Sequence, residues 1–473
     1  MSRGLHWFRN DLRLRDNTAL LALADQVEEW LPVFVLDPRL LGPPVARRAG
    51  PRACFLLDCV TRLSKSLAER GVPLLVRSGL PEEVLPQLLH QTGATKLSFN
   101  RATTPFAQQR DAAVTRCVEK QGVQVLSRVD HVVFAADDIR KATGEAGYAV
   151  YTPYRNRWWE RWQQASKPPQ RTGRLPRPIA GFESDPVPSV PAVERTEDEC
   201  RIPTGGELAA ARRLEGFLDG PAGRYHEDRD RPDIDGTSRL SPHLRFGTIS
   251  VRDCLDRGGF AAEAESGLRM GVRKWLDELV WREFYAAILE QHPRVLRGNY
   301  RREYDALEWN DDADGFAAWC EGRTGFPIVD AGMRQLRATG WMHNRVRMIV
   351  ASFLTKDLLI DWREGERFFF EWLVDGDPAS NNGGWQWAAS TGTDAQPYFR
   401  IFNPTAQGKR WDPEGRYVKR WIPELRSVPD SQVHDPAGPL AAGNYPMPIV
   451  DHAERRALAL ERFQRARALA DRT

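Results

Sequence analysis

The residues best suited to bind a ligand lie together in one stretch, residues 375–404, which reads DGDPASNNGGWQWAASTGTDAQPYFRIFNP. Its first part combines two aspartates, paired asparagines, paired glycines and two tryptophans. Glycine lets a backbone approach a flat ligand, Asn and Asp supply directional hydrogen bonds, and Trp supplies rigid faces. The stretch is too polar for a typical core helix and too rich in Trp for a solvent loop. It therefore indicates the wall of a cavity for a planar, hydrogen-bonding cofactor, the alternative being a well-packed turn region without a ligand.

The composition is that of a globular protein. At 473 residues the chain predicts two or three domains, and its net charge of +3 means that any nucleic-acid surface must come from local clusters of Arg. The N-terminus MSRGLHWFRND lacks the apolar core of a signal peptide, and no run approaches a membrane span. Six cysteines without CxxC or Cys/His metal spacing argue against zinc and against a disulfide framework, and favour a cytoplasmic protein: Cys54, Cys59, Cys117, Cys200, Cys254 and Cys320.

Two domains joined by a long linker are predicted from the periodicity. In residues 1–135, five short apolar runs (GLHWF, LPVFVLD, PLLVRS, KLSFN and VQVLSR) alternate with helical patterns, which predicts a five-stranded parallel α/β sheet. No GxGxxG follows the first run, so a dinucleotide site is not supported there. Residues 136–205 are rich in Pro, interleave Arg with Trp in YTPYRNRWWERW, and predict a long linker. A capping box at Thr204 and Glu207 then predicts the start of an all-α domain over 206–473.

A second candidate ligand segment opens this helical domain. Tyr225 to Arg229 is followed by residues 237–242, TSRLSP, in which Ser241 stands before a proline. Ser followed by Pro is typical of a helix N-terminus, so we expect Ser241 to be the N-cap. A helix start with clustered hydroxyls can bind a diphosphate through its N–H groups and dipole. A plain helix cap is the competing interpretation.

Two predicted helices each present two different faces. In the helix expected over 268–291, apolar residues form one stripe, and Glu278, Trp281 and Tyr285 form another. A carboxylate beside an indole favours a ligand site or a surface ion pair. In the helix expected from residue 341, one face is apolar, and Asn344, Arg347 and Met348 share the other. His343 alone is typical of a structural histidine.

Taken together, these segments resemble the class I cyclobutane pyrimidine dimer photolyases of the photolyase/cryptochrome family. The resemblance spans nearly the whole chain and includes WFRNDLRLRDN at residues 7–17, TSRLS, WREFY and the stretch from residue 375 to 408. It implies a flavodoxin-like N-terminal lobe, a helical lobe that binds FAD as the reduced anion, and repair of ultraviolet-damaged DNA. In that reaction an electron from the excited cofactor splits a flipped-out pyrimidine dimer.

The resemblance also implies roles for individual residues. Asn381 would lie beside flavin N5 and tune its redox state, and Arg347 would pair with Asp375. Trp309, Trp362 and Trp385, which otherwise read as three separate core tryptophans, match the electron-transfer chain. Further FAD-binding residues would be Tyr225, Thr237, Ser238, Arg239, Leu240, Ser241, Trp275, Glu278, Gly376 and Asp377. DNA or the dimer would be bound by Arg229, Glu278, Trp281, Asn344, Arg345, Met348, Trp387 and Gln407.

Some positions narrow these expectations. Relatives that repair (6-4) photoproducts carry two histidines where this chain has Asn344 and Met348, which favours the cyclobutane dimer. Folate-binding relatives bind a second, light-harvesting (antenna) chromophore with Glu, Cys and Lys, where this chain has Ala107, Leu296 and Arg297. The identity of the antenna chromophore (methenyltetrahydrofolate, a deazaflavin or none) therefore stays open. The alternatives are a cryptochrome-like photosensor and an ordinary flavin oxidoreductase, for which no nicotinamide site is readable. We expect a monomer, because the DNA-facing hole must stay open.

Overall fold

The structure, a computed structural model of the whole chain, describes all residues except 42–49, 142, 145–146, 166–172, 189–201, 436–444 and 471–473. Cys200, part of the predicted linker and the end of the predicted C-terminal helix lie outside the described residues. Contacts divide the chain into two compact units. Unit 1 comprises residues 1–194, 202–223 and 238–293, and unit 2 comprises residues 195–201, 224–237 and 294–473. The predicted domains 1–135 and 206–473 and the predicted linker 136–205 were assigned from sequence patterns rather than contacts, and they stay a prediction.

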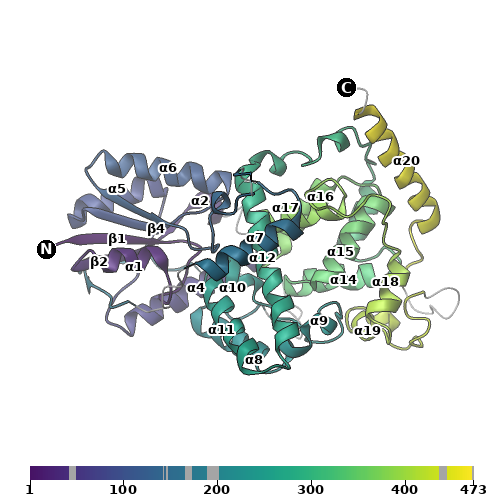
Figure 1. Cartoon of the computed structure of the whole chain (residues 1–473), viewed down its shortest axis with the longest axis horizontal. Helices are drawn as coiled ribbons and strands as arrows, with labels where there is room; N and C mark the ends of the chain where they lie inside the picture. Colours follow the sequence, from purple (N-terminus) through teal and green to yellow (C-terminus); the bar gives the residue numbers. More distant parts are fainter. Residues whose placement is uncertain are drawn as a thin grey trace. The chain divides into compact units, whose positions relative to one another are not determined.

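Unit 1 is built on a parallel sheet (Figure 1). Its strands run in the order β3-β2-β1-β4-β5, and each coincides with one of the five predicted apolar runs. They are β1 Arg3–Phe8, β2 Glu29–Leu36, β3 Leu75–Ser78, β4 Lys96–Asn100 and β5 Gln124–Arg128, with a two-residue β6 Arg177–Pro178 beside β2. The predicted five-stranded parallel sheet is confirmed. Its order differs from the 2-1-3-4-5 order of flavodoxin and is that of a Rossmann sheet, because the crossover after β1 places β2 between β1 and β3.

Helices cover both faces of this sheet, which explains why its strands are almost continuously apolar. In Figure 1, α5 and α6 lie on one side and α1 and α4 on the other. The bounds are α1 Thr18–Ala24, α2 Pro38–Leu41, α4 Gly50–Ala68, α5 Pro81–Thr92 and α6 Pro105–Glu119. The rest of the unit is helical: α7 Tyr151–Gln164, α8 Glu207–Leu218, α10 Ser241–Arg245, α11 Val251–Ala264 and α12 Arg269–Gln291.

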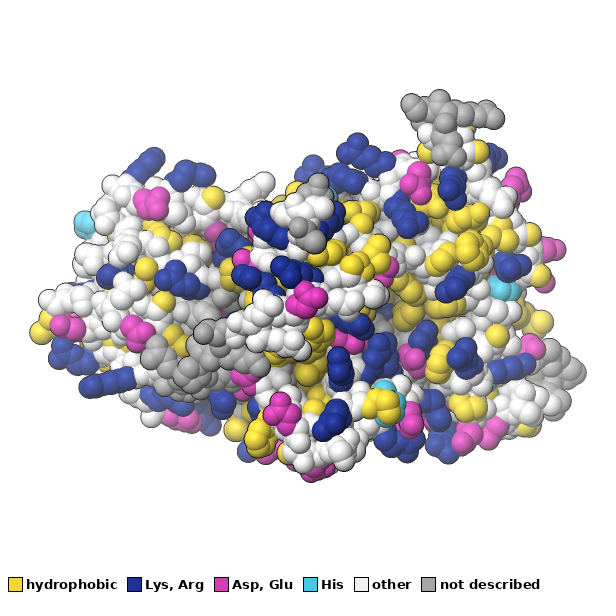
Figure 2. Space-filling model, viewed as in Figure 1, with side chains coloured by type: hydrophobic (Ala, Val, Ile, Leu, Met, Phe, Trp, Pro, Cys, Tyr) yellow, Lys and Arg dark blue, Asp and Glu magenta, His cyan; other side chains and the backbone are white. Residues whose placement is uncertain are grey.

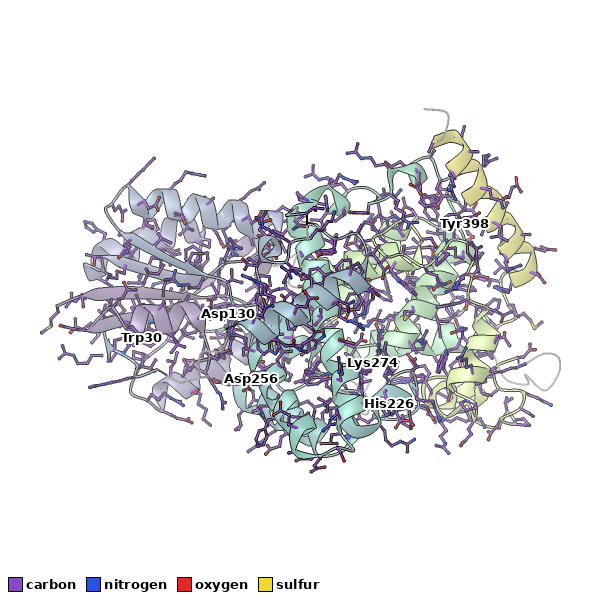
Figure 3. All side chains as sticks on the ribbon, in the orientation of Figure 1. Trp30, Asp130, His226, Asp256, Lys274 and Tyr398 are labelled. Atoms are coloured by element: carbon purple, nitrogen blue, oxygen red, sulfur yellow. The ribbon has the colours of Figure 1, made fainter. Side chains whose placement is uncertain are left out.

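A buried ion cluster joins the later helices of unit 1 to the sheet. Asp130, which follows β5, accepts hydrogen bonds at 2.8 Å from Arg13 and from Arg252 of α11 (Figure 3). Burial alone would raise the pKa of Asp130, but the two guanidinium groups hold it below its usual range. Gly247 lies against the loop after β1 that carries Arg13. Its φ is +62°, and a Cβ on it would meet the carbonyl oxygen of Asn10 at 2.2 Å. Only glycine fits this position.

The start of α8 corrects the predicted capping box. Gly206, not Thr204, is the N-cap, and it makes no side-chain cap bond. Glu207 turns away from its own helix and accepts hydrogen bonds from the backbone N–H groups of Leu14 and Arg15, both at 3.0 Å. A long-range contact therefore replaces the local one.

Unit 2 is a helical bundle around a large apolar cluster. Its helices are α9 Tyr225–Asp228, α13 Ala313–Glu321, α14 Pro327–Thr339, α15 Asn344–Ser352, α16 Trp362–Trp372, α17 Pro378–Ala388, α18 Pro404–Trp411, α19 Arg416–Trp421 and α20 His452–Ala470. A π-helical turn, Phe353–Asp357, follows α15. None of the helices in the described part of the chain is long and apolar enough to cross a membrane.

Candidate functional site

The predicted site residues fall in both units. Unit 1 holds residues 238–241, Trp275, Glu278 and Trp281, and unit 2 holds the others. Each group is described below within its own unit. Lys and Arg side chains are scattered among acidic and apolar ones on the face of the molecule seen in Figure 2.

The helix α12 presents the polar stripe that its sequence predicts. Glu278, Trp281 and Tyr285 are each partly exposed, while the opposite stripe, which includes Val272 and Val280, is buried. The Glu278 carboxylate lies 3.9 Å from the ammonium of Lys274, one turn earlier (Figure 3). Because both side chains are partly exposed and the distance is long, this ion pair contributes little to stability. The stripe therefore combines an acceptor with an aromatic face.

Buried carboxylates behind this stripe fix α12, and none of them was predicted. Glu283 accepts hydrogen bonds from the N–H groups of Val133 and Phe134, at 2.8 and 3.0 Å, and from the indole of Trp158, at 2.7 Å. Burial raises the pKa of Glu283 to about 7. Asp277 accepts from the indole of Trp159 at 2.9 Å. YTPYRNRWWERW, predicted as linker, is thus helix α7, and it docks on α12.

Residues 238–241 have the irregular backbone expected of a ligand segment. Arg239 adopts φ +49°, which is uncommon for a residue with a side chain and is found at ligand-binding turns. Ser238 is held by Trp275, whose indole donates to its hydroxyl at 3.2 Å, and by Arg213, which donates to its carbonyl at 2.8 Å. The predicted cap is wrong by one residue: Leu240 is the N-cap of α10 and Ser241 is its first helical residue.

In unit 2, the polar stretch from residue 375 is a helix, contrary to expectation. Asp377 caps α17 by accepting from the N–H of Ser380 at 2.9 Å. The helix tolerates buried amides because each finds partners: Asn382 donates to the carbonyl of Val295, and Gln386 donates to the same carbonyl, both at 3.0 Å. The polarity that argued against a helix is satisfied by neighbouring segments of the same unit.

The predicted pair beside this helix is present. Arg347 donates to both carboxylate oxygens of Asp375, at 3.2 and 2.9 Å, in the bidentate geometry that fixes a guanidinium. Asn381 is buried and donates to the carbonyl of Glu366 at 2.9 Å. Glu366, which was not predicted, also accepts from Asn382 at 3.2 Å, and burial raises its pKa to about 7.

The helix α15 shows the two faces expected of it. Val346 and Val350 are buried, while Asn344 is exposed and its amide lies 3.8 Å from the sulfur of Met348. The helix begins at Asn344, three residues later than expected. His343 is its N-cap and accepts from the N–H of residue 345 at 3.2 Å, so its structural role is confirmed.

Two predicted DNA-binding residues lie beside one carboxylate, and Trp411 links one of them to a third. Asp230 is 2.8 Å from Arg345 and 3.9 Å from Arg229. Arg345 also lies over the ring of Trp411, whose indole donates to Gln407 at 3.0 Å. Asp230 and Trp411 were not predicted, because no local pattern links residues so far apart.

The three tryptophans assigned to electron transfer share one apolar cluster. Trp362 and Trp385 are buried in it, and Trp309 packs against it. The indole of Trp362 donates to Asn299 at 2.9 Å. The indole N–H of Trp385 is buried and has no hydrogen-bond partner within the described part of the chain. Trp319 packs edge to face against Trp385 at 6.0 Å and is a further member of the cluster, which no sequence pattern predicts.

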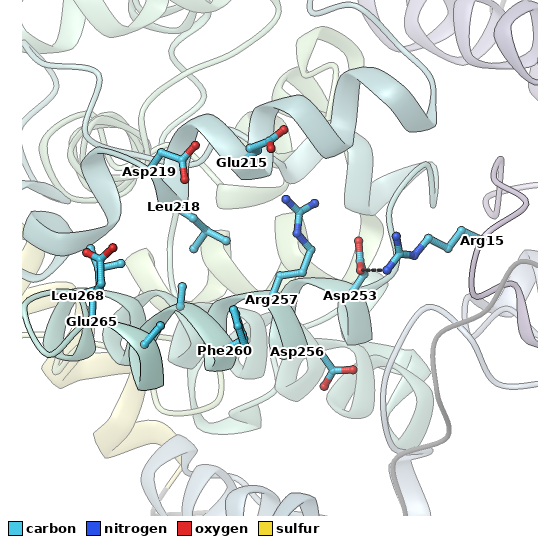
Figure 4. A pocket seen from close by; sticks show the side chains of 12 residues that line it. Arg15, Glu215, Leu218, Asp219, Asp253, Asp256, Arg257, Phe260, Glu265 and Leu268 are labelled. Carbon is cyan, nitrogen blue, oxygen red and sulfur yellow. Dashed lines mark ion pairs between the residues drawn. The ribbon is translucent and has the colours of Figure 1, made fainter.

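A cavity of about 710 Å³ lies apart from these residues, between α8 and α11 of unit 1 (Figure 4). Asp253 and Arg15 form an ion pair at 3.4 Å in its wall. Among the described residues, none of the predicted site residues lines it. Its other charged lining side chains are mostly acidic: Glu215, Asp219, Asp256, Glu265 and Arg257.

Comparisons with known proteins agree with this arrangement of an α/β unit and a helical unit with a polar, Trp-rich helix. Residues 4–172 match the family model described as DNA photolyase, and residues 275–465 match the model described as FAD binding domain of DNA photolyase. A deoxyribodipyrimidine photo-lyase of Halobacterium salinarum is 42% identical, over 98% of this chain and 99% of its own length. The chain therefore belongs to the DNA photolyase family.

Solved structures of several kinds share the fold. A bacterial class III photolyase of Agrobacterium tumefaciens is 36% identical with a TM-score of 0.87, over 99% of this chain and 98% of its own. An archaeal photolyase of Sulfolobus tokodaii with two FAD molecules is 33% identical with a TM-score of 0.83, over 98% and 100%. A cryptochrome of Synechocystis is 29% identical with a TM-score of 0.86, over 98% and 99%.

Proposed function

We propose that this protein is a deoxyribodipyrimidine photo-lyase of class I, which uses light to split cyclobutane pyrimidine dimers in DNA. The observation that carries the repair activity is full-length similarity to a protein named deoxyribodipyrimidine photo-lyase, and the class I assignment rests on the sequence motifs. The geometry of α12 supports it, because one stripe offers a carboxylate and an indole to a ligand. In reaction class this is a carbon–carbon lyase.

The residues present fit FAD. The strained backbone at Arg239 and the fixed Ser238 hydroxyl suit a diphosphate, and residues 237–241 with Tyr225 would hold it. The bidentate Arg347–Asp375 pair, the buried Asn381 amide and the buried indole N–H of Trp385 suit a polar, planar ring. Bound FAD in its reduced anionic form would supply the photoexcited electron. Further contacts would come from Leu240, Trp275, Glu278, Gly376 and Asp377.

Contacts to the dimer are proposed separately within each unit. Glu278 would accept a hydrogen bond from a pyrimidine, and Trp281 would stack on it, an interaction that contributes about 1–3 kcal/mol per base in single-strand systems. Within unit 2, Trp387, Asn344 and Met348 would contact the dimer. Amide and thioether side chains at the last two positions favour the cyclobutane dimer over the (6-4) photoproduct.

The surrounding DNA would be bound through phosphates. Arg229, Arg345 and Gln407 lie close together in unit 2 and would contact the backbone. Because Asp230 offsets part of their charge, we expect a moderate rather than steep weakening of binding by salt. We further propose a cytosolic monomer, in line with the thiol state of the five cysteines in the described part of the chain.

We propose that Trp309, Trp362 and Trp385 carry an electron from the protein surface inward, which would restore the reduced cofactor. Packing in or against one apolar cluster holds their rings in fixed positions. The antenna is proposed only as a second chromophore of open identity, since Ala107 replaces the carboxylate of folate-binding relatives.

An action spectrum for repair of cyclobutane dimers by the purified protein on ultraviolet-irradiated DNA tests the proposal. Repair that follows the absorption of reduced flavin supports it. An extra, stronger band at another wavelength would reveal an antenna and its chemical class. Flavin binding without repair at any wavelength would refute it and favour a photosensor, the activity class suggested by the similar cryptochrome structure.

A further inference from the structure

The indole of Trp281 is already stacked on another aromatic ring. Tyr151, the first residue of α7, lies parallel to it, with ring centroids 3.6 Å apart and an interplanar angle of 11°. Tyr151 is buried, whereas Trp281 stays partly exposed. One side of the indole is therefore covered by protein.

The Tyr151 ring is itself held from two directions. Its hydroxyl donates to the backbone carbonyl of Asp277, on α12, at 2.6 Å. Its edge packs against Phe284 at 5.9 Å, one turn after Trp281. A ring with a bonded hydroxyl and a packed edge cannot turn away from the indole without losing both contacts.

The helix that carries Tyr151 is anchored along its length. The indoles of Trp158 and Trp159 donate to the buried carboxylates of Glu283 and Asp277 on α12, at 2.7 and 2.9 Å. Arg155 lies 3.4 Å from the same Asp277 carboxylate. These contacts fix α7 on α12 independently of the ring stack, so a change at Tyr151 alone leaves the helix docked.

We propose that Tyr151 is a positioning residue, which fixes the plane of Trp281 before DNA arrives and leaves only its exposed part for a base to stack on. The inference rests on the proposed function, since it takes Trp281 as the residue on which the dimer packs. A ring that is already fixed loses less freedom on binding, and so binds more tightly. Tyr151 would thus raise the affinity for dimer-containing DNA without touching DNA.

The test compares binding in the dark of two short oligonucleotides, with and without a cyclobutane thymine dimer, to FAD-loaded protein. Tyr151→Leu, which removes the ring, should weaken binding of the damaged oligonucleotide about three- to tenfold, the range expected for an aromatic pair. Binding of the undamaged oligonucleotide and the FAD content should stay unchanged. Tyr151→Phe, which keeps the ring, should bind within about twofold of the wild type.

A matched control separates the ring stack from the docking of α7. Tyr154 is also buried on α7 and packs against Phe284 at 5.2 Å, but its ring contacts are with Phe284 and Tyr148. Tyr154→Leu should leave the preference for damaged DNA intact. An equal loss in Tyr154→Leu and Tyr151→Leu would overturn the proposal, as would a Tyr151→Leu protein that binds like the wild type.

A double-mutant cycle gives the sharpest outcome. Trp281→Ala should weaken binding of the damaged oligonucleotide about five- to hundredfold, and adding Tyr151→Leu should cost nothing more, because the ring to be positioned is gone. Losses that multiply would overturn the proposal. If Tyr151→Leu does not fold, Tyr151→Met takes its place in the cycle. If the wild type shows no preference for the damaged oligonucleotide, the proposed function and the inference are both rejected. If the wild type prefers the damaged oligonucleotide and Trp281→Ala weakens its binding as expected, but Tyr151→Leu binds it like the wild type, the inference alone is rejected.

Discussion

Replacing Gly365 by alanine tests how closely α16 packs on Trp385. A Cβ at this position would lie 2.1 and 2.5 Å from two carbons of the indole, Cη2 and Cζ3. It would also lie 2.6 Å from a methyl carbon of Leu354. Carbon atoms in contact are normally about 3.5–4.0 Å apart. At least one of the three groups must therefore move by about an ångström.

The expected free-energy change is the difference of two effects. Alanine in a helix interior is favoured over glycine by about 1 kcal/mol. Overpacking a buried site costs about 1–3 kcal/mol. We expect a cost of about 3 kcal/mol, because Trp385 is only 2% exposed and is fixed by Phe369 at 5.0 Å and Trp319 at 6.0 Å. Gly365→Ala should thus lower the free energy of unfolding by about 2 kcal/mol.

Urea unfolding measures the change in the free energy of unfolding, and flavin photoreduction measures the effect on the proposed electron chain. Gly216→Ala is the matched control, because Gly216 lies in α8, is exposed, and has no heavy atom within 4 Å of a Cβ built on it. The control should gain about 0.5–1 kcal/mol and photoreduce at the wild-type rate. Gly365→Ala should photoreduce more slowly, since its clash displaces a tryptophan of the proposed electron chain. A Gly365→Ala protein stabilised as much as the control would refute the close packing.

Three further changes have defined outcomes. Burial raises the pKa of Glu366 from 4.5 to about 7, so the native state binds this proton more tightly than the unfolded chain, and stability should fall as pH rises from about 4.5 to about 7. Glu366→Gln, which can still accept from Asn382, should remove that part of the pH dependence in urea unfolding at about pH 5 and about pH 8. Gly247→Ala should destabilise the protein by about 3 kcal/mol or more in the same assay. The new Cβ would meet the carbonyl of Asn10, and the positive φ is strained for a residue with a side chain. A loss of less than about 1 kcal/mol would contradict the backbone placement. Trp309→Phe should slow photoreduction of the flavin by external donors. A fully retained rate would exclude Trp309 from the proposed electron-transfer chain.

The sheet could be predicted from sequence because its signal is local. Each strand is a short apolar run between turn residues, and burial on both faces makes the run nearly continuous. The same holds for α12, expected over 268–291 and found at Arg269–Gln291, since its apolar stripe repeats with helical spacing. The strand order could not be predicted in the same way, because it depends on where each crossover places its strand.

The errors share a cause, which is that long-range partners decide the local structure. The stretch from residue 375 looked too polar for a buried helix, yet the carbonyl of Val295 satisfies its amides. Glu207 looked like half of a capping box, yet its carboxylate binds the backbone of residues 14 and 15. In both cases the partner lies some 80 or more residues away, where local spacing carries no information.

The same reasoning explains the structural contacts made by the most recognisable N-terminal motif. In WFRNDLRLRDN, Arg13 donates to Asp130 and to the carbonyl of Gly247, and Asn17 caps α1 by accepting from the N–H of Leu20 at 3.2 Å. These residues join three distant segments of unit 1, so changing one should cost stability. The stripe of α12, in contrast, leaves Glu278 and Trp281 partly exposed above a set of buried carboxylates. Family resemblance identifies both segments equally, and only burial and hydrogen bonding distinguish the residues that hold the fold from those that we propose bind a ligand.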